Sequence, residues 1–299
     1  MTLIGIILAL IAERLLSQLR EWRELAWYAR YLDWLDQHLK PAWLWQSAWG
    51  LLLLVALPVA AVALLQAALQ GGVITLLGLL FSVLVLVFCL GPRDLAEEIH
   101  SYLDAQAAGD LVEAQRIAAD LRQLPPGAVA EPGADGRGLV QGVLLQGNER
   151  LLAVLFWFYV LGPLGAVLYR LSAMLPQLLG ERAQASETLR EVALRLHAIL
   201  AWLPARITAA LYTLAGSTDD ALQEWRAHFD QADGEWPARS WGLLARVGCG
   251  AMQMEDDGDQ KPIELSPEDA LIEALALVRR ALLLGLGVLA LFTIGGWLT

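Results

Sequence analysis

The sequence predicts an all-α fold: a polytopic membrane helical bundle with four or five crossings and a helical cytosolic layer. Hydrophobic residues make up 57% of the 299 residues and the mean hydropathy is +0.50, whereas soluble domains average about 45–50% apolar residues. Residues 41–92 contain no charged side chain, and the chain holds 12 tryptophans, a residue enriched at membrane interfaces. These observations exclude an ordinary soluble globular enzyme.

The chain is expected to form a single membrane-integrated domain that begins with an N-terminal segment and a cytosolic helix over residues 1–40. The apolar start, Thr2–Ala12, is too short to span a bilayer alone, and it lacks the basic region of a cleaved signal peptide. We therefore expect a retained segment, and the sequence leaves open whether it crosses the membrane.

Residues 41–92 are predicted to form a transmembrane hairpin. A crossing needs about 20 apolar residues, so Gln46–Leu69 and Val73–Gly91 are two crossings joined by a polar Gln-Gly-Gly turn. Pro58 lies in the middle of the first crossing, where a bilayer helix tolerates it if a neighbour satisfies the carbonyl that it frees. Three tryptophans at the entrance are expected at headgroup level: Trp43, Trp45 and Trp49.

Residues 93–150 are predicted to form a cytosolic α-hairpin followed by a loop. Apolar residues recur at helical spacing from Leu95, and Gly109-Asp110 is expected to end one helix and cap the next. Glu113 completes a capping box for the second helix. The two helices must pack on something else, since a lone pair buries little apolar surface.

Residues 151–215 are predicted to form a transmembrane pair. The first member is the uncharged run Leu151–Tyr169, and the second is Leu194–Ala215, which Arg206 interrupts. An arginine at a bilayer centre costs about 2.5–3.5 kcal/mol on insertion scales, so Arg206 should face the protein interior or an interface.

The rest of the chain is predicted to be an acidic cytosolic region, 216–280, and a C-terminal transmembrane helix, 281–299. That helix should begin near residue 267, because Ser266 is a capping residue and proline suits the first helical position. The acidic run Glu255–Asp259 lacks the EF-hand pattern and is expected to be a solvated loop. If the crossings alternate, residues 13–40, 93–150 and 216–280 share the cytosolic side, and residues 171–195 lie on the opposite side.

Charge and motifs exclude several functions. The formal net charge is −11, which argues against nucleic acid as a partner, because Lys and Arg supply that affinity. Only Cys89 and Cys249 are present, so there is no cysteine metal cluster or disulfide framework. The P-loop, dinucleotide, zinc-protease and serine-elbow motifs do not occur, and we expect no catalytic set, metal or cofactor.

Charged residues beside the apolar segments form the candidate site. Glu13 and Arg14 end the first segment, Asn148 and Glu149 precede the run at Leu151, and Arg206 interrupts the last segment of the pair. Such carboxylate and guanidinium groups can hold an anionic ligand at the membrane–cytosol interface. The alternative is that they are structural pairs or side chains that reach to the interface. We expect Glu13 and Arg206 to approach one another or to share a polar cavity with Asn148 and Glu149.

Three passages, taken together, resemble the membrane-bound cobalamin-biosynthesis synthase family CbiB, which pairs an AGD α-hairpin with an FW…GA..YR span and a WIPAR segment. Within that superfamily, the opening MTLIGIILALIAERLL, the length and the apolar tail resemble the AmpE family most. The three passages are Ser101–Leu121, Leu151–Leu175 and Ala198–Leu211.

The AmpE resemblance implies a signalling or modulator protein of β-lactamase regulation and the cell-wall stress response. It also implies a multi-pass protein of the bacterial inner membrane with a cytosolic polar layer, whose partners are the bilayer and a cytosolic muropeptide amidase resembling AmpD. The alternative is a membrane-bound synthase or ligase that joins an amine or amino alcohol to a carboxylate. The synthase family's Gly-Asp-Pro motif is Glu13-Arg14 here, and its Glu-Asn and Asp-Gly elements are reduced to Gly147–Arg150. Those acids are its expected magnesium and nucleotide contacts, so their reduction favours the regulator over an enzyme.

Overall fold

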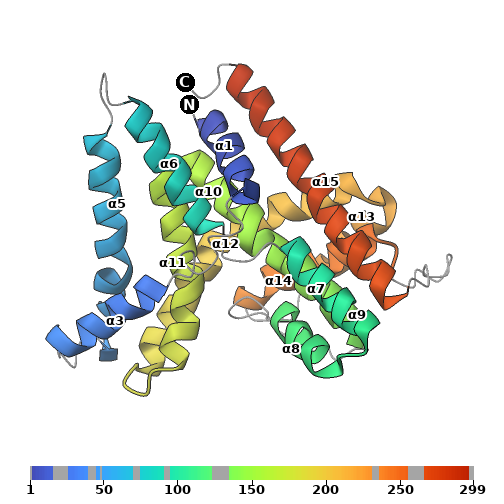
Figure 1. The fold of residues 1–299 in the computed structure, drawn as a ribbon, viewed down its shortest axis with the longest axis horizontal. Helices are drawn as coiled ribbons and strands as arrows, with labels where there is room; N and C mark the ends of the chain where they lie inside the picture. The colour runs from blue at the N-terminus through green and yellow to red at the C-terminus, as the bar shows by residue number, and fades with distance from the viewer. Residues whose placement is uncertain are drawn as a thin grey trace. The chain divides into compact units, whose positions relative to one another are not determined.

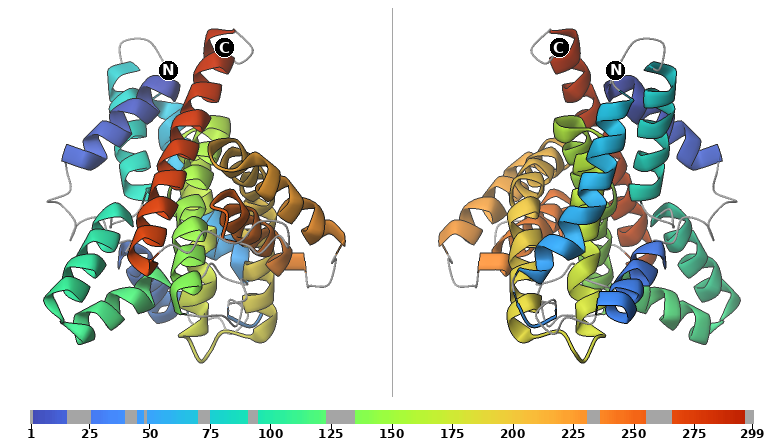
Figure 2. Two further views of the ribbon diagram at one scale, coloured as in Figure 1. Left: turned by 90° about the vertical axis from the view of Figure 1, so that its right-hand side faces the viewer. Right: turned by 90° about the vertical axis from the view of Figure 1, so that its left-hand side faces the viewer.

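The computed structural model describes residues 2–15, 26–39, 45–47, 49–69, 75–90, 95–122, 135–230, 236–254 and 266–295, and all regular structure in these ranges is helical (Figures 1 and 2). The predicted all-α fold is therefore confirmed. The chain forms two compact units: unit 1 comprises residues 1–92 and 153–200, and unit 2 comprises residues 93–152 and 201–299.

Unit 1 is a bundle of apolar helices in which α11 packs on α5 and α6, and α1 packs on α6 and α10. The helix α12 begins in this unit and continues into unit 2. The elements are α1 (Thr2–Leu15), α3 (Ala26–Leu39), the π-helical turn η2 (Leu52–Ala56), α5 (Leu57–Ala68), α6 (Thr75–Cys89), α10 (Ala153–Leu161), α11 (Pro163–Gly180) and α12 (Glu187–Ala215).

Two tyrosines on α3 satisfy the backbone next to Pro58. An α-helical carbonyl pairs with the N–H four residues later and a π-helical carbonyl with the N–H five residues later, so a proline at 58 leaves the carbonyls of Leu54 and Leu53 without that donor. The Tyr28 hydroxyl donates to the Leu54 carbonyl (3.3 Å) and the Tyr31 hydroxyl to the Leu53 carbonyl (2.9 Å). The two tyrosines thus meet the condition under which a helix tolerates Pro58, namely that a neighbour satisfies the freed carbonyl.

The run Leu151–Tyr169 does not form one crossing, because the chain reverses at Gly162. This glycine has a φ of +70° and Pro163 begins α11, so α10 ends after nine residues. A Cβ at Gly165 would lie 2.2 Å from the Trp157 carbonyl oxygen, so only glycine permits α10 and α11 to approach this closely. The expectation of a single helix over this run was wrong, because a left-handed glycine followed by proline outweighs apolar continuity.

The segment after α11 lies against α3, which corrects the expected topology. The Arg182 guanidinium donates to the Asp33 carboxylate (2.5 Å), and the Ser186 N–H donates to the Trp45 carbonyl (2.8 Å). Residues 171–195 were expected on the side of the membrane opposite to residues 13–40. Direct contact excludes a separation by about 30 Å of hydrocarbon, so that part of the alternating scheme was wrong.

Unit 2 contains the expected α-hairpin and caps. The Asp110 carboxylate accepts from the Glu113 N–H (3.1 Å) at the start of α8, and the Ser266 hydroxyl accepts from the Asp269 N–H (3.1 Å) at the start of α15, where Pro267 is the first helical residue. The predicted caps at Asp110 and Ser266 are confirmed, and the Glu113 carboxylate, expected to complete a capping box, accepts from the Arg116 guanidinium. The elements are α7 (Leu95–Ala108), α8 (Leu111–Leu121), α9 (Asp135–Gly147), the π-helical turn η4 (Asn148–Leu152), the second half of α12, α13 (Thr218–Asp230), α14 (Trp236–Ala251) and α15 (Pro267–Ile294).

The described residues include two helices long and apolar enough to cross a membrane, Glu187–Ala215 and Pro267–Thr293. Two shorter apolar helices, Leu52–Ala68 and Leu76–Cys89, cover most of the predicted hairpin. Its turn at residues 70–72 and the acidic run 255–259 lie outside the described residues. The protein is thus helical with two candidate membrane spans.

Candidate functional site

The centre of unit 2 is a helix that is enclosed on all sides. Every residue from Leu139 to Glu149 is buried, including four polar ones: Gln141, Gln146, Asn148 and Glu149. A helix on the surface of a domain normally buries only one stripe. Buried polar side chains are costly unless they are paired, so this segment is the best candidate for a functional role in unit 2.

Small residues allow the neighbouring elements to reach this helix. A Cβ at Gly142 would lie 2.1 Å from the Leu121 carbonyl oxygen at the end of α8, and one at Gly147 would lie 2.8 Å from the Val278 side chain on α15. The Tyr212 hydroxyl on α12 donates to the Leu144 carbonyl (2.8 Å). The helix is therefore held between α8, α12 and α15.

The π-helical turn η4 places Asn148 and Glu149 in this enclosed position. The Thr208 hydroxyl on α12 donates to the Asn148 Oδ1 (2.8 Å), which fixes the orientation of the amide. The Asn148 side chain is completely buried and its Nδ2 has no hydrogen-bond partner among the described residues. A π-helical turn is rare and is frequently found at functional sites, and here it holds a buried amide donor, Asn148 Nδ2, and a buried carboxylate, Glu149.

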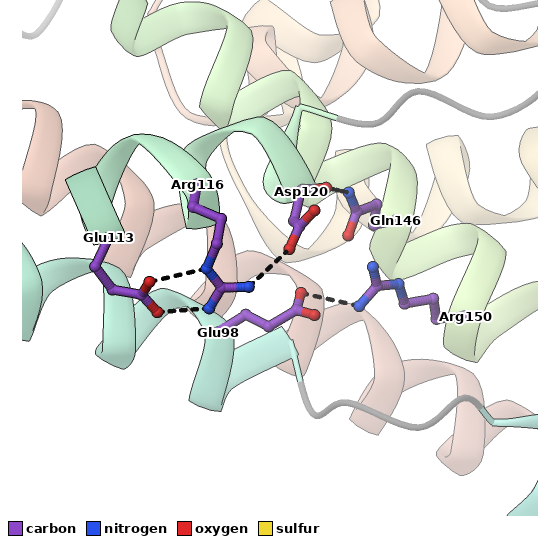
Figure 3. A network of polar contacts seen from close by, with 6 residues as sticks. All are labelled: Glu98, Glu113, Arg116, Asp120, Gln146 and Arg150. Carbon is purple, nitrogen blue, oxygen red and sulfur yellow. Dashed lines mark hydrogen bonds and ion pairs between the residues drawn. The ribbon is translucent and has the colours of Figure 1, made fainter. Parts of the chain in front are cut away.

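Polar contacts join η4 to α7 and the end of α9 to α8 (Figure 3). The Arg150 guanidinium donates to the Glu98 carboxylate (2.9 Å), a pair that is largely shielded from solvent. The Gln146 amide donates to the carbonyls of Asp120 and Leu121 and so caps the end of α8. The Arg116 guanidinium on α8 pairs with Glu113 and approaches Asp120. The side of the enclosed helix that faces α7 and α8 is therefore charged but internally paired.

Arg206 lies on α12, two residues before Thr208, in an electropositive corner of unit 2. Its guanidinium lies 4.1 Å from the centre of the Trp202 ring and donates to the Ser240 hydroxyl (3.3 Å) and to the Trp202 carbonyl. Within the described residues it has no carboxylate partner. Burial lowers the pKa of the nearby His228, and the positive charges of Arg246, Arg206 and Arg239 add to that shift.

The structure brings only part of the predicted site together. Asn148 and Glu149 are buried in η4, and the contact of Asn148 is with Thr208 on the same helix as Arg206. Glu13 and Arg14 belong to α1, but their side chains lie outside the described residues. The shared site of Glu13 and Arg206 therefore stays a prediction.

Sequence reasoning missed the partners that orient these groups, namely Glu98, Thr208 and Tyr212. Thr208 and Tyr212 follow the Trp-Leu-Pro-Ala-Arg passage at helical spacing, so they share a face of α12 that the passage could have indicated. Glu98 had no such signal, because an acidic residue in the first turn of a helix is ordinary helix chemistry.

The described residues do not fit a divalent metal centre. No group of three or more His, Cys, Asp or Glu side chains in the described ranges is placed to hold a metal ion. Among the acids near η4, Glu98 is paired with Arg150.

Comparison with known proteins assigns the family. The family model described as "CobD/Cbib protein" matches residues 6–248. The chain is 33% identical over 255 residues to "Cobalamin biosynthesis protein CobD" of Stutzerimonas stutzeri, covering 83% of this chain and 80% of the relative. It is 32% identical over 256 residues to the protein of the same name from Chromobacterium violaceum, covering 82% and 78%. A weaker relative, "Probable cobalamin biosynthesis protein CobD" of Pyrococcus furiosus, is 25% identical over 136 residues, covering 46% and 47%. No solved structure matches the chain.

These findings correct the functional expectation. The superfamily resemblance is confirmed, but the relatives are named for cobalamin biosynthesis, which overturns the AmpE assignment and the expected role in β-lactamase regulation. The match covers most of the chain and both of its units. The chain belongs to the CobD/Cbib protein family.

Proposed function

We propose that this protein is a membrane-embedded synthase of cobalamin biosynthesis that joins an amine or amino alcohol to a carboxylate of a cobalamin precursor. The observation that carries the proposal is the family match over residues 6–248, supported by two relatives that share one name, at 32–33% identity. The net reaction joins a carboxylate to an ammonium group, giving an amide with the loss of the elements of one water molecule. Because a carboxylate oxygen does not leave unaided, a nucleoside triphosphate would first have to phosphorylate it, and the amine would then displace phosphate.

The enclosed turn η4 supplies groups suited to that reaction. The buried Asn148 Nδ2 is a donor for a carboxylate or carbonyl oxygen, and its direction is fixed because Oδ1 accepts from Thr208. The Glu149 carboxylate is an acceptor for an ammonium group and for the proton that the nitrogen loses when the amide forms. Arg206 adds a guanidinium without a described carboxylate partner, which suits an anionic part of a substrate.

We also propose that the protein is a multi-pass protein of the bacterial inner membrane with its polar helices in the cytosol. Exposed leucine, valine and phenylalanine side chains cover one side of α5, α6 and the second half of α15, and an apolar surface of this kind requires lipid or protein cover. The helices α9 and α14, which come from two of the predicted cytosolic segments, pack together. Reporter fusions at Gly133 and Gly258 should both report the cytosol, and opposite reports would refute this topology.

Complementation tests the synthase proposal. The chain is expressed in a bacterium that synthesises cobalamin but lacks its own CobD, and growth is measured under conditions that require cobalamin. The wild-type chain should restore growth, and the amide product should appear by mass spectrometry at the summed mass of both precursors minus one water. Failure of growth with normal amounts of the chain in the membrane, while the Stutzerimonas relative succeeds, would overturn the proposal.

Two variants then locate the site. Asn148→Ala and Glu149→Gln should abolish growth while membrane levels stay normal, because each removes one of the two proposed groups. The matched control is Glu187→Gln, whose carboxylate is 88% exposed on α12 and which should grow like the wild type. Growth of both η4 variants at the wild-type rate would exclude this turn as the site.

A further inference from the structure

The helix α3 has one face buried in unit 1 and one aromatic face that nothing in the described structure covers. Tyr28, Leu32 and Leu35 are completely buried, whereas Trp27 and Trp34 are 39% and 49% exposed. The two tryptophans are seven residues apart, which places them on the same side of the helix two turns from each other. Gln37, on the same side, is also exposed.

Several contacts fix α3 at one end of the apolar helices of unit 1. The hydroxyls of Tyr28 and Tyr31 donate to the Leu54 and Leu53 carbonyls next to Pro58. The Arg182 guanidinium pairs with Asp33 on α3 and lies 5.5 Å from the centre of the Trp45 ring. Figure 1 shows α3 at an angle to α5, near the lower end of that helix.

This arrangement determines what can cover the tryptophan face. The apolar helix formed by η2 and α5 exposes Leu52, Leu57 and Leu64 along its length, and Trp49 just before it is 73% exposed. We therefore place the hydrocarbon layer beside this helix and the headgroup layer near its first residues. A helix near that end of α5 lies in that headgroup layer. Tryptophan is enriched there because its ring is apolar and its indole N–H is polar.

The charges of α3 indicate which lipids it requires. The helix carries one arginine, Arg30, against two aspartates, Asp33 and Asp36, so α3 lacks the basic face that draws many interfacial helices to anionic lipid. Its adhesion must come from the rings and not from net charge. Neutral phosphatidylcholine should therefore be sufficient.

We propose that α3 is an in-plane interfacial helix whose Trp27–Trp34 face lies in the lipid headgroup layer at the end of α5. This inference goes beyond the proposed synthase activity and requires only that unit 1 is embedded in the bilayer. It gives α3 a physical role: it holds the Pro58 turn of the apolar helix at a fixed depth, because Tyr28 and Tyr31 connect the two.

Site-directed spin labelling of the full chain in phosphatidylcholine nanodiscs tests the inference. A label at Gln37→Cys reports the depth of α3, and a label at Leu64→Cys, 73% exposed on α5, reports whether unit 1 is embedded. Ala107→Cys on the polar helix α7 is the control for water, and lipids with labels at known chain positions calibrate depth. The native cysteines are buried, and a preparation without introduced cysteine measures their background labelling.

The Gln37→Cys label should report headgroup depth while Leu64→Cys reports hydrocarbon. Replacing both rings, with Trp27→Gln and Trp34→Gln, should move the Gln37→Cys label toward water and leave Leu64→Cys in place. A Gln37→Cys label as accessible to a water-soluble relaxation agent as Ala107→Cys would overturn the inference. So would a label shielded from both this agent and oxygen, since a protein partner would then cover the face. Hydrocarbon depth at Leu64→Cys in either case would leave the embedding of unit 1 intact.

Discussion

Removal of the tyrosine hydroxyls that cap the Pro58 turn should destabilise the protein in a way that depends on the proline. The change Tyr28→Phe keeps the ring and deletes only the group that donates to the Leu54 carbonyl (3.3 Å), and Tyr31→Phe does the same for Leu53 (2.9 Å). Burial raises the pKa of both hydroxyls, so both remain donors across the accessible pH range.

The expected magnitudes follow from burial and bond geometry. A hydrogen bond is worth about 0.5–1.5 kcal/mol net, and a buried carbonyl left unpaired costs about 1–3 kcal/mol, although hydrogen bonds between membrane helices average only about 0.6 kcal/mol. The Tyr28–Leu54 bond is buried and the Tyr31–Leu53 bond is partly exposed. We expect a loss of about 1–2 kcal/mol for Tyr28→Phe and about 0.5–1 kcal/mol for Tyr31→Phe.

The variant Pro58→Ala is the control background in which the tyrosine should matter less. The change Pro58→Ala restores an N–H four residues after Leu54, so that carbonyl no longer depends on the tyrosine. The free energy of unfolding is measured by reversible denaturation in mixed micelles for the wild type, Tyr28→Phe, Pro58→Ala and the double variant, which together form a double-mutant cycle. Tyr28→Phe should cost at least about 0.5 kcal/mol less in the Pro58→Ala chain than in the wild type. An equal cost in both backgrounds would refute the reasoning that the tyrosine replaces the donor missing at Pro58.

Three further predictions concern unit 2, each measured as a change in the free energy of unfolding. Gly142→Ala should destabilise the protein strongly because its Cβ would lie 2.1 Å from a backbone oxygen, whereas Gly138→Ala, with open space around its Cβ, should stabilise α9 by about 0.5–1 kcal/mol; similar effects would argue against close packing of α9. The free energy of unfolding should decrease as the pH drops below about 6.5, the ordinary pKa of histidine. The pKa of His228 is lowered in the folded protein, so on acidification the unfolded chain binds a proton at His228 before the folded chain does. His228→Gln should reduce this pH dependence, and an unchanged pH dependence would exclude His228 as its source. Arg150→Gln should lower the free energy of unfolding by about 3 kcal/mol because its partner Glu98 is buried. Arg195→Gln, which breaks an exposed pair, should lower it by under about 1 kcal/mol. Equal losses would show that the Arg150–Glu98 pair is not shielded from solvent.

Local rules predicted the helix ends well. The caps at Asp110 and Ser266 depend on residues within one helical turn, so the printed order of residues is enough to specify them. The sequence also shows that a carbonyl before Pro58 needs another hydrogen-bond donor, since proline itself lacks the N–H. The sequence could not identify Tyr28 and Tyr31 as those donors, because they lie 26 and 22 residues from the carbonyls to which they donate.

The error at Leu151–Tyr169 shows where hydropathy misleads. An uncharged run of 19 residues has the composition of one crossing, but composition does not indicate where the chain changes direction. Gly162, in the left-handed region, and Pro163 reverse the chain direction. The Leu-Gly-Pro-Leu-Gly sequence could have predicted this turn. The consequence is that Arg182, just after α11, contacts Asp33 on α3.

The sequence by itself determined the helical fold class, the apolar segments, the caps and the superfamily, because composition, periodicity and shared passages are local properties of the chain. It also selected Asn148, Glu149 and Arg206 as residues of interest, because charged and amide side chains beside apolar segments are rare and costly. Only the tertiary structure decided that Asn148 is completely buried and that its amide is oriented by Thr208, which lies 60 positions away in the chain. The physical reason is that burial and hydrogen-bond direction are set by close packing between distant elements, and no local pattern records which elements will meet.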